Sequence, residues 1–445
     1  MLFDVLLNGA KSSRNRQKTP AKNIAGATVG FRGNKVLIMK FNEMPFLPVI
    51  LGGDITTYSL ARAFHEAYGI RSVAVSMIRS RLCADSDIIE NLIVPSMDTR
   101  ETFLSELEKI GKARSGSKKL ILLACGDWYV RMIVENRALL EQYYVIPYIQ
   151  EELLNRLVLK DSFYSICEEI SVPYPKTYVY DCKNPPEKLE LPFGFPVIAK
   201  PASSAAYHYA QFPGKKKVFK FDTQEELEAM LKNLNASGYD YKFLLQDFIP
   251  GDDTGMRILT CYCDQSGKVR FMAFGQTLLE DKGDMGIGNP VAIINRVDLT
   301  IMEHAKRLLE HVGYTGFANF DIKYDPRDNS YRFFEINTRL GRSNYYVTAS
   351  GFNVVKWIVD DLIDHKEFAD KPVIADNTDC LYTVVPKSVL KTYIKDPSLK
   401  AEMLSLYARK KAVNPIAYRA ETKFLRKIYP YVFLWKQKRK FRGKI

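Results

Sequence analysis

The alternation of apolar and polar positions predicts a parallel α/β domain near the start of the chain. An apolar run at 47–51 is followed by a glycine turn and by apolar residues at helical spacing, which stop at Gly69. A strand, a glycine turn and a helix in this order open a βαβ unit. Apolar runs at 73–75 and 120–124 predict two more strands, and Gly-Asp closely follows the first and third runs. We therefore expect a small parallel α/β domain over 45–150 with carboxylates at its strand ends, where ligands sit in open sheets.

Beyond residue 150 the pattern changes to short strands mixed with helices. The spacing predicts helices over 151–170, 298–312 and 353–365. The predicted strands, which include one hairpin and one further strand pair, cover 195–200, 217–221, 243–249, 256–263, 268–278, 317–324 and 331–336. A glycine-rich loop is expected at 283–290. The order of these elements indicates α+β lobes after the parallel domain.

The positive charge of the chain lies at its two ends. The 64 Lys and Arg residues exceed the 51 Asp and Glu residues by 13. Residues 1–44 hold eight basic and two acidic residues, and 423–445 hold nine basic residues and no acid, so the body between them is close to neutral. A protein that coats nucleic acid carries the charge on its body, so we expect no nucleic-acid partner. The leader 1–44 has little periodicity and is expected to be flexible.

The apolar runs and the cysteines indicate a cytoplasmic protein. No apolar run is long enough to span a bilayer. The apolar start lacks the basic residues and the cleavage site of a secretory signal. The seven cysteines are scattered, and no second Cys or His cluster accompanies the one Cys-x-Cys pair. Reduced structural thiols are therefore expected, not zinc ligands or disulfides.

Polar residues stand inside the apolar strand pair predicted at 317–336. Asp321 lies in the first strand, and Glu335, Asn337 and Arg339 follow each other at intervals of two in and after the second. Residues two apart share one face of a strand. Oxygen ligands that converge from paired strands suit Mg²⁺, with phosphate and water oxygens completing its shell. The alternative is a row of solvent-facing polar residues, but the alternation with buried-type apolar residues favours a metal site.

Five segments resemble, in sequence and in order, the motifs of the ATP-grasp superfamily. They are NRLVLKD (155–161), FPVIAKP (195–201), LLQDFIPG (244–251), FANFDIK (317–323) and FFEINTR (333–339). In that superfamily two stacked lobes hold ATP, and paired strands supply Asp or Glu, Glu and Asn to magnesium. The resemblance therefore implies ATP and Mg²⁺ as cofactors, and Mn²⁺ can take the place of Mg²⁺.

The resemblance also implies a domain plan. A pre-ATP-grasp α/β domain would occupy 45–150, and the two α+β lobes of the ATP-grasp fold would occupy 151–365, with a hinge near 246–250. The leader 1–44 would precede them. A C-terminal extension at 366–445 would follow and would end in a basic, aromatic tail.

The residues that the resemblance assigns to ATP fall into three groups. Two lysines would reach the phosphates, two serines would stand in the phosphate loop, and the hinge with a following acid would hold adenine and ribose. In chain order they are Lys160, Lys200, Ser203, Ser204, Gln246, Asp247, Phe248, Ile249 and Asp253. Lys200 ends an apolar strand, whereas Lys160 lies on a predicted helix, where exposure to solvent is the ordinary outcome. The loop after Lys200 departs from the superfamily because it is bulky instead of glycine-rich, which keeps a non-catalytic nucleotide-binding module as an alternative.

Two arginines are candidates for the reaction itself. Arg339 could stabilise the charge on an acyl phosphate, and Arg257 could bind the carboxylate of the acyl substrate, with surface pairing as its alternative. The segments 48–69 and 337–346 resemble the D-aspartate ligase group of the superfamily. That group joins the β-carboxylate of D-aspartate to the lysine side chain of a peptidoglycan precursor. The implied partners are thus a small amino acid and an amine acceptor such as a muramyl peptide; a ligase for another amino acid or peptide is the alternative.

The C-terminal segment 423–445 interleaves its nine basic residues with six aromatic ones. This composition suits an anionic membrane surface, which predicts peripheral contact with the inner face of the membrane. A solvated basic tail with a few packed aromatics is the alternative. The oligomeric state is not specified by the sequence.

Overall fold

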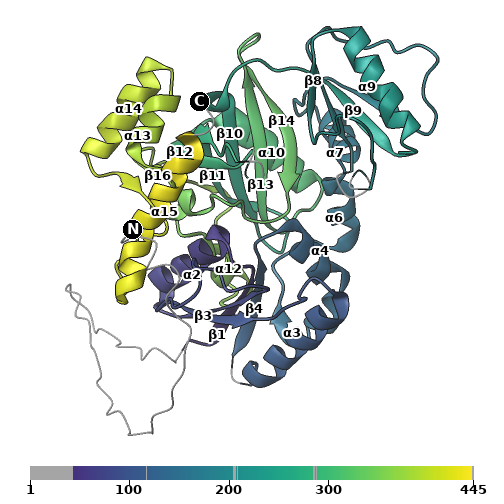
Figure 1. The fold of residues 1–445 in the computed structure, drawn as a ribbon. Coiled ribbons are helices and arrows are strands. Elements are labelled where there is room, and N and C mark those ends of the chain that lie inside the picture. Colours follow the sequence, from purple (N-terminus) through teal and green to yellow (C-terminus); the bar gives the residue numbers. More distant parts are fainter. Residues whose placement is uncertain are drawn as a thin grey trace, which may run out of the picture. The chain divides into compact units, whose positions relative to one another are not determined.

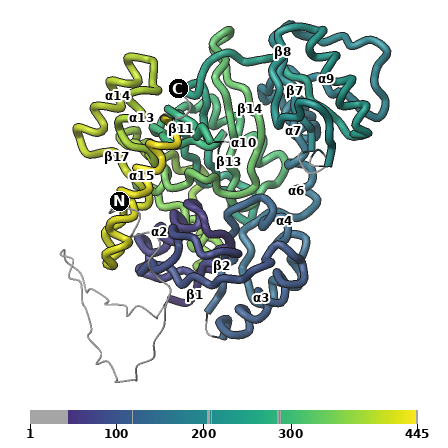
Figure 2. The backbone as a smooth tube through the Cα atoms, viewed as in Figure 1, coloured from purple at the N-terminus to yellow at the C-terminus, as the bar shows by residue number. Residues whose placement is uncertain are grey.

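Three β-sheets organise the part of the chain that the structure describes (Figures 1 and 2). The structure is a computed structural model, and it describes residues 44–116, 118–203, 207, 209–283, 286 and 288–442. Below they are called the N-terminal sheet (β1–β5), the small sheet (β6–β9) and the large sheet (β10–β17).

The N-terminal sheet is parallel throughout, with the strand order β3-β2-β1-β4-β5. Its strands are β1 (Phe46–Leu51), β2 (Ser72–Ser76), β3 (Ile89–Ile93), β4 (Lys119–Ala124) and β5 (Tyr144–Val145). Its helices are α2 (Ile55–Tyr68), α3 (Arg100–Arg114), α4 (Asp127–Glu135) and α5 (Arg137–Leu140). The three predicted strands and the helix between the first two are confirmed. Helix α2 begins where the Asp54 side chain accepts hydrogen bonds from two backbone N–H groups, and it ends at Gly69, whose φ of 66° suits glycine.

The segment after the N-terminal sheet forms two helices where the sequence predicted one. They are α6 (Glu151–Val158) and α7 (Lys160–Glu169), and Leu159 between them has extended backbone angles. A continuous helix would place Lys160 and Asp161, three and four residues after the buried Leu157, on its buried face. The helix instead breaks at Leu159, which leaves Lys160 at the first position of α7, although the side chains of Lys160 and Asp161 are still only 22% and 16% exposed. The chain has no Gly or Pro there, so the apolar spacing alone did not reveal the break.

The small sheet has the order β6-β9-β7-β8 and is covered by helix α9 (Gln224–Ala236) (Figure 1). Its strands are β6 (Thr177–Asp181), β7 (Val197–Pro201), β8 (Phe219–Phe221) and β9 (Lys242–Asp247). Neighbouring strands are antiparallel. Its core is a separate aromatic cluster in which Phe243 packs against Tyr207, Phe219 and Tyr239.

The large sheet has the order β14-β13-β10-β11-β12-β16-β17, with β15 paired to β11. Its strands are β10 (Met256–Cys263), β11 (Val269–Glu280), β12 (Pro290–Arg296), β13 (Gly316–Asp325), β14 (Ser330–Asn337), β15 (Val373–Ile374), β16 (Leu381–Thr383) and β17 (Ala412–Val413). Its helices are η1 (Asp253–Gly255), α10 (Leu299–His311), α11 (Tyr345–Ala349), α12 (Val354–Leu362), α13 (Lys387–Tyr393), α14 (Pro397–Ala408) and α15 (Phe424–Arg442). The predicted hairpin (β10–β11) and the predicted strand pair (β13–β14) are both present.

The C-terminal segment is folded through residue 442 and is not a solvated tail. Helix α15 buries Arg426, Pro430 and Phe441. The buried Glu421 carboxylate accepts hydrogen bonds from the Tyr58 hydroxyl (2.9 Å) and from Arg426 (2.8 Å). One hydrophobic cluster joins residues from the N-terminal sheet, the large sheet and this segment. The hydrophobic core is therefore continuous across the predicted domain boundaries at 150 and 365. The boundaries themselves stay predictions.

Helix α15 is the longest of the described helices. Over the described part of the chain, no helix combines the length and the apolar character that crossing a membrane requires.

Candidate active site

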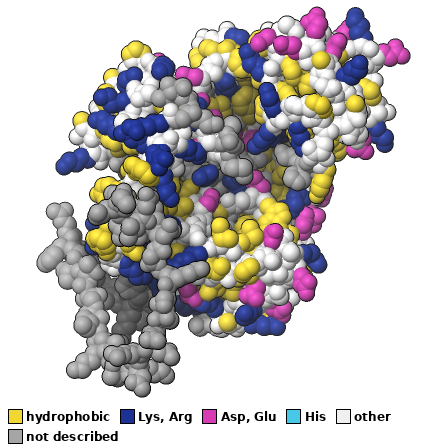
Figure 3. All heavy atoms as spheres, in the orientation of Figure 1, with side chains coloured by type: hydrophobic (Ala, Val, Ile, Leu, Met, Phe, Trp, Pro, Cys, Tyr) yellow, Lys and Arg dark blue, Asp and Glu magenta, His cyan; other side chains and the backbone are white. Residues whose placement is uncertain are grey.

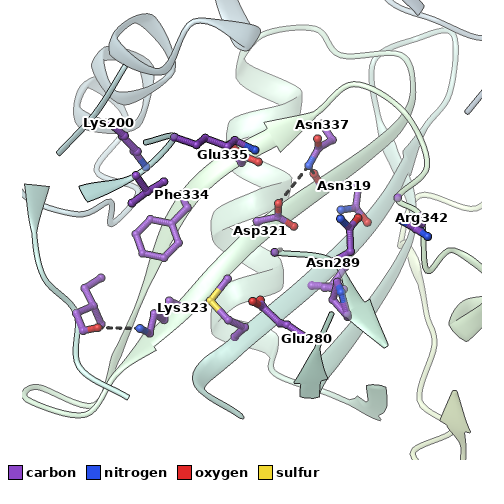
Figure 4. A pocket seen from close by; sticks show the side chains of 18 of the residues that line it. Lys200, Glu280, Asn289, Asn319, Asp321, Lys323, Phe334, Glu335, Asn337 and Arg342 are labelled. Atoms are coloured by element: carbon purple, nitrogen blue, oxygen red, sulfur yellow. Dashed lines mark hydrogen bonds between the residues drawn. The ribbon is translucent and has the colours of Figure 1, made fainter. Parts of the chain in front are cut away.

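A cavity of about 570 Å³ lies between the small sheet and the large sheet. Lys200 on β7 and Gln246 on β9 line it from one side, and Ile258 on β10, Asp321 on β13 and Glu335 on β14 line it from the other. Figure 4 shows the polar side chains of both sheets turned into this space. Its volume is in the range of pockets that hold small ligands and cofactors. The two sheets thus form the two walls of one site.

The strand pair β13–β14 brings the three predicted metal ligands together. Asp321 is directly opposite Glu335 in the ladder, and Asn319 is directly opposite Asn337. The Asn337 side-chain amide lies 3.4 Å from the Asp321 carboxylate (Figure 4). Residues next to them, such as Phe320 and Ile322, are fully buried on the other face. The alternation read from the sequence therefore separates a polar, cavity-facing side from an apolar core side.

The two carboxylates have opposite electrostatic surroundings. Glu335 lies 2.7 Å from Lys160. Burial alone would raise the pKa of Glu335, but the charge and hydrogen bond of Lys160 and the charge of Lys200 hold that pKa at about 2. Burial and the nearby charge of Glu335 raise the pKa of Asp321 instead. A cation between the two carboxylates would therefore favour the charged form of both.

The donor set fits magnesium that is shared with a phosphate. Two carboxylates and an amide oxygen are the hard oxygen ligands that Mg²⁺ prefers, and Mg²⁺ keeps several water or phosphate ligands. Within the described ranges, no three His, Cys, Asp or Glu side chains group closely enough to hold a metal by themselves. The site thus matches a metal that arrives with a nucleotide, and not a protein-only cage.

Lys200 faces the carboxylates from the other wall of the cavity, and Lys160 reaches Glu335 from outside the cavity lining. Burial, aided by the charge of Lys160, lowers the pKa of Lys200 to about 7, and Glu335 only partly opposes this. The Lys200 ammonium also lies 5.4 Å from the centre of the Phe334 ring. A bound phosphate would supply the negative charge that this buried lysine needs. The ion pair with Glu335 turns the Lys160 side chain toward the carboxylates and away from solvent.

The hinge residues line the cavity as expected, and several of their polar groups already have partners. Gln246 is buried and donates to Thr177 (2.8 Å), and the Asp247 carboxylate binds Arg327. The Phe248 N–H donates to Pro196 (3.2 Å), and the Ile249 carbonyl accepts from Lys323 (2.8 Å). An adenine ring would have to use the remaining backbone groups or the second lone pair of that carbonyl.

Three other predicted residues, Lys160, Ser203 and Asp253, do not line the cavity. The Asp253 carboxylate accepts from the backbone N–H of Glu280 (3.0 Å) and from Lys282 (2.6 Å). Of the neighbouring acids Asp253 and Glu280, Glu280 is the one that lines the cavity. Ser203 is outside the lining, and Ser204 lies outside the described residues.

Arg257 does not reach the cavity either, which corrects its expected role as a ligand of the substrate carboxylate. Its neighbours Met256 and Ile258 line the cavity, so the period of two along β10 turns Arg257 to the opposite face. There its guanidinium donates to the carbonyls of Thr254 (2.7 Å) and Met256 (3.0 Å). It also lies about 6 Å from the ring of Tyr331.

Arg339 enters the cavity and meets a residue from the N-terminal sheet. Its guanidinium lies 2.7 Å from the carboxylate of Asp127, at the start of α4. Both residues line the cavity. Asp127 was expected only as a strand-end carboxylate, and no local signal connected it with a residue more than two hundred positions away.

Sequence reasoning missed several polar residues of the cavity wall. They are Lys217, Glu280, Asn289, Asn319, Lys323 and Arg342. Asn319 and Lys323 each stand two positions from Asp321 on β13, so the same strand period could have found them. Arg342 follows Arg339 in a loop and also lines the cavity (Figure 4). For the residues in loops, the sequence carries no comparable spacing signal.

Comparison with known proteins places this site in a family. Residues 287–360, which include Asp321, Glu335 and Asn337, match the family model described as the ATP-binding domain of the carbamoyl-phosphate synthase L chain. The chain is 40% identical to a D-aspartate ligase of Enterococcus faecium over 358 residues, which cover 79% of this chain and 85% of that protein. It is 24% identical to a D-alanine–D-alanine ligase of Wolbachia pipientis wMel, over 49% of this chain and 68% of that one.

Solved structures share the fold at low sequence identity. The biotin carboxylase domain of a Hydrogenobacter thermophilus 2-oxoglutarate carboxylase, in complex with MgADP, matches with a TM-score of 0.55 and 14% identity, over 76% of this chain and 74% of that one. An L-amino acid ligase from Bacillus licheniformis matches with a TM-score of 0.51 and 14% identity, over 73% and 75%. These likenesses show the ATP-grasp fold, which the sequence predicted.

Proposed function

The chain belongs to the D-aspartate ligase family of ATP-grasp enzymes, and from this premise we propose that it joins the β-carboxylate of D-aspartate to the lysine side-chain amine of a peptidoglycan precursor. The observation that carries the proposal is the convergence of Asp321, Glu335, Asn337, Arg339 and Lys200 on one cavity, with Lys160 paired to Glu335 from outside its lining. An ATP-dependent ligase needs these groups because it must hold a triphosphate and stabilise the charge that moves from it.

The proposed reaction has two steps. A carboxylate oxygen of aspartate attacks the γ-phosphorus of ATP, the bond from that phosphorus to the bridging oxygen breaks, and ADP leaves. The acceptor amine then attacks the acyl carbon, phosphate leaves with the electrons of the acyl–oxygen bond, and the amine nitrogen loses a proton. The products are an amide, ADP and phosphate, so the electrons and atoms balance without any further reactant.

The residues of this chain would divide the work by position. Lys160 and Lys200 would hold phosphate oxygens, and Arg339 would stabilise the negative charge that develops on the transferred group. Asp321, Glu335 and Asn337 would hold Mg²⁺, which neutralises phosphate charge; Mn²⁺ would suit the same oxygen ligands. Arg342, which lines the cavity, replaces Arg257 as our candidate for the carboxylate of the amino acid. Catalysis would then rest mainly on positioning and charge.

The acceptor and the location are proposals of the same kind. A muramyl peptide with a free lysine amine fits the family membership, and ATP as the phosphoryl donor fits a cytoplasmic location. A bulky loop after Lys200 is the one feature that favours a second reading, a nucleotide-binding module without turnover. Some positions of that loop lie outside the described residues, so the choice between the two functions rests on the carboxylates and the lysines. Those groups favour the ligase.

The proposal is tested by ADP release with Mg²⁺. D-aspartate or L-aspartate is supplied with and without a lysine-containing muramyl pentapeptide precursor. We expect turnover only with D-aspartate and the precursor together. Turnover with another amino acid would keep the ligase and change its substrate, whereas tight ATP binding without turnover on any pair would support the non-catalytic module.

A further inference from the structure

The outward face of helix α15 exposes large apolar side chains. Phe424, Leu425 and Tyr431 are each about three-quarters exposed (74%, 75% and 74%), and Trp435 is 54% exposed. Ile428 is also exposed. Most large apolar residues of a folded protein of this size are covered, and a contiguous exposed group marks an interaction site.

These side chains form one stripe along the helix. Residues 424, 428, 431 and 435 follow each other at spacings of four, three and four, which keeps them on one side. The opposite side carries the buried Arg426, Pro430 and Phe441, which hold the helix against the core. The stripe is therefore fixed outward by the packing of the inner side and is not a frayed end.

Basic side chains of α15 border the stripe, and at the start of the helix Lys423 also lies 3.7 Å from Asp87. Lys427, Lys436 and Arg439 are exposed on α15, and Arg439 lies 4.9 Å from the centre of the Trp435 ring. Residues 423–442 hold eight Lys and Arg and no Asp or Glu. The bias extends over α13–α15, where Lys and Arg gather on the surface in Figure 3: residues 381–445 hold 17 basic and three acidic residues.

A neighbouring loop adds to this surface at the start of the helix. Arg426 donates to the carbonyls of Arg81 (2.8 Å) and Leu82 (3.1 Å), so the loop after β2 is tied to α15. In the same loop Ile78 is 75% exposed, and it stands between the basic Arg71 and Arg79 in the sequence. The exposed apolar residues thus come from two segments, each with basic neighbours.

We propose that the outward face of α15 docks on the surface of an anionic lipid bilayer. The aromatic and aliphatic stripe would enter the interface between headgroups and acyl chains, where Trp and Tyr side chains prefer to lie. The lysines and arginines would contact the negative headgroups. A single sign of charge combined with an apolar stripe fits a bilayer better than nucleic acid, which offers no apolar counterpart to five such side chains.

The docking does not depend on the ligase reaction, and binding alone tests it. The full-length protein is sedimented with phosphatidylcholine vesicles and with vesicles in which about one-third of the lipid is phosphatidylglycerol. We expect binding to the anionic vesicles only, and weaker binding as salt screens the charges. We also expect a blue shift of tryptophan fluorescence that is lost in Trp435→Phe. Failure of the wild-type protein to bind anionic vesicles at low salt would overturn the proposal.

Point variants are preferred to removal of the helix, because Glu421 and Arg426 join it to the core. Phe424→Ser/Trp435→Ser and Lys436→Glu/Arg439→Glu should each lower the bound fraction at least tenfold. Leu299→Ser and Lys306→Glu on α10 are the matched controls, because they make the same changes away from the stripe. Equal loss in the controls, or no loss in the α15 variants, would refute the assignment. A dimer that light scattering detects in the wild type but not in Phe424→Ser/Trp435→Ser, without vesicle binding, would assign the face to a second copy instead.

Discussion

The Lys160 ammonium lies 2.7 Å from a carboxylate oxygen of Glu335, and this contact joins helix α7 to strand β14. The sequence assigned Lys160 to the phosphates of ATP and Glu335 to the metal, on separate grounds. The structure pairs them directly, so each offsets the charge of the other. Binding of Mg²⁺ and a triphosphate would replace one ion pair by two, lysine with phosphate and carboxylate with metal.

Glu335→Gln should lower kcat by at least about a hundredfold and leave the fold intact. The amide keeps the size of the side chain but removes the charge that a metal ligand needs, and losses of this size follow removal of a single charge-stabilising group. ADP release measures the effect, and the midpoint of thermal unfolding measures the fold. Asp328→Asn is the matched control, because Asp328 is an exposed carboxylate at the β13–β14 turn. A folded Glu335→Gln enzyme with wild-type turnover would refute the metal assignment.

Arg339→Lys should lower kcat about a hundredfold while changing the dissociation constant of ATP by less than about threefold. The ammonium cannot reproduce the planar fork that Asp127 holds at 2.7 Å. Asp127→Asn should have a smaller effect in the same direction, about tenfold, because it loosens the guanidinium without removing it. Arg131→Lys, in an exposed pair with Glu135, is the control. An equal rise in the ATP dissociation constant for Arg339→Lys would show instead that Arg339 holds the nucleotide.

The parts of the site that the sequence predicted are those governed by strand period. Asp321, Glu335 and Asn337 stand at alternate positions of two strands whose apolar neighbours fill the core, so local pattern was enough to place them. The same rule places Arg257 on the face of β10 opposite to Met256 and Ile258, and therefore away from the cavity. Its expected role rested on nearness in sequence to the hinge, which says nothing about the face of a strand.

The parts that sequence could not predict depend on contacts between distant elements. Asp127 meets Arg339 only because the end of the N-terminal sheet reaches the cavity, and no periodicity records that meeting. The break at Leu159 is marked by no Gly or Pro in the sequence. Glu421 is an ordinary acid in a basic segment until folding places it beside Tyr58. Each case is decided by tertiary packing, which overrides local preference.

Glu280 should make the stability of the ligand-free protein depend on pH. Burial, together with the charge of Asp253, raises the pKa of this carboxyl from its ordinary 4.5 to about 7. Between these two values the folded state holds a proton that the unfolded state has lost, so stability falls as pH rises through that window. Glu280→Gln removes this pH-dependent contribution to stability. We expect it to gain about 1–2 kcal/mol relative to wild type between pH 5 and pH 8, a range that allows for partial solvent access.

Unfolding in urea at several pH values measures that difference, and Glu303→Gln, an exposed carboxylate on α10, is its control. The same gain for Glu303→Gln, or a constant gap between wild type and Glu280→Gln at all pH values, would mean that the Glu280 carboxyl ionises normally in the folded protein.

Lys440 should position the loop that borders the active-site cavity. Its ammonium lies 2.5 Å from one oxygen of the buried Asp281 carboxylate, which also accepts the Gly283 N–H (2.9 Å). The Asp281 N–H in turn donates to the carbonyl of Asn289, a residue of the cavity wall (2.8 Å). The inner side of α15 thus holds the base of this loop, and Asn289 at that base lines the proposed substrate space.

Lys440→Met keeps most of the side-chain volume but leaves the Asp281 carboxylate buried without its cation, which typically costs a few kcal/mol. We expect a loss of about 1–3 kcal/mol in the free energy of unfolding and a rise in KM for the substrates.

Lys440→Met/Asp281→Asn should recover most of the stability, since the uncompensated charge is gone, and a double-mutant cycle with urea unfolding measures this coupling. Lys438→Met controls for the general loss of basic charge. Lys438 stands two residues before Lys440 on α15 and has no such carboxylate partner among the described contacts. If both single variants and the double variant lose stability additively, the two residues do not act as a pair, and the loop is held by its own backbone bonds. If stability couples but KM is unchanged, the clamp supports the fold without shaping the cavity.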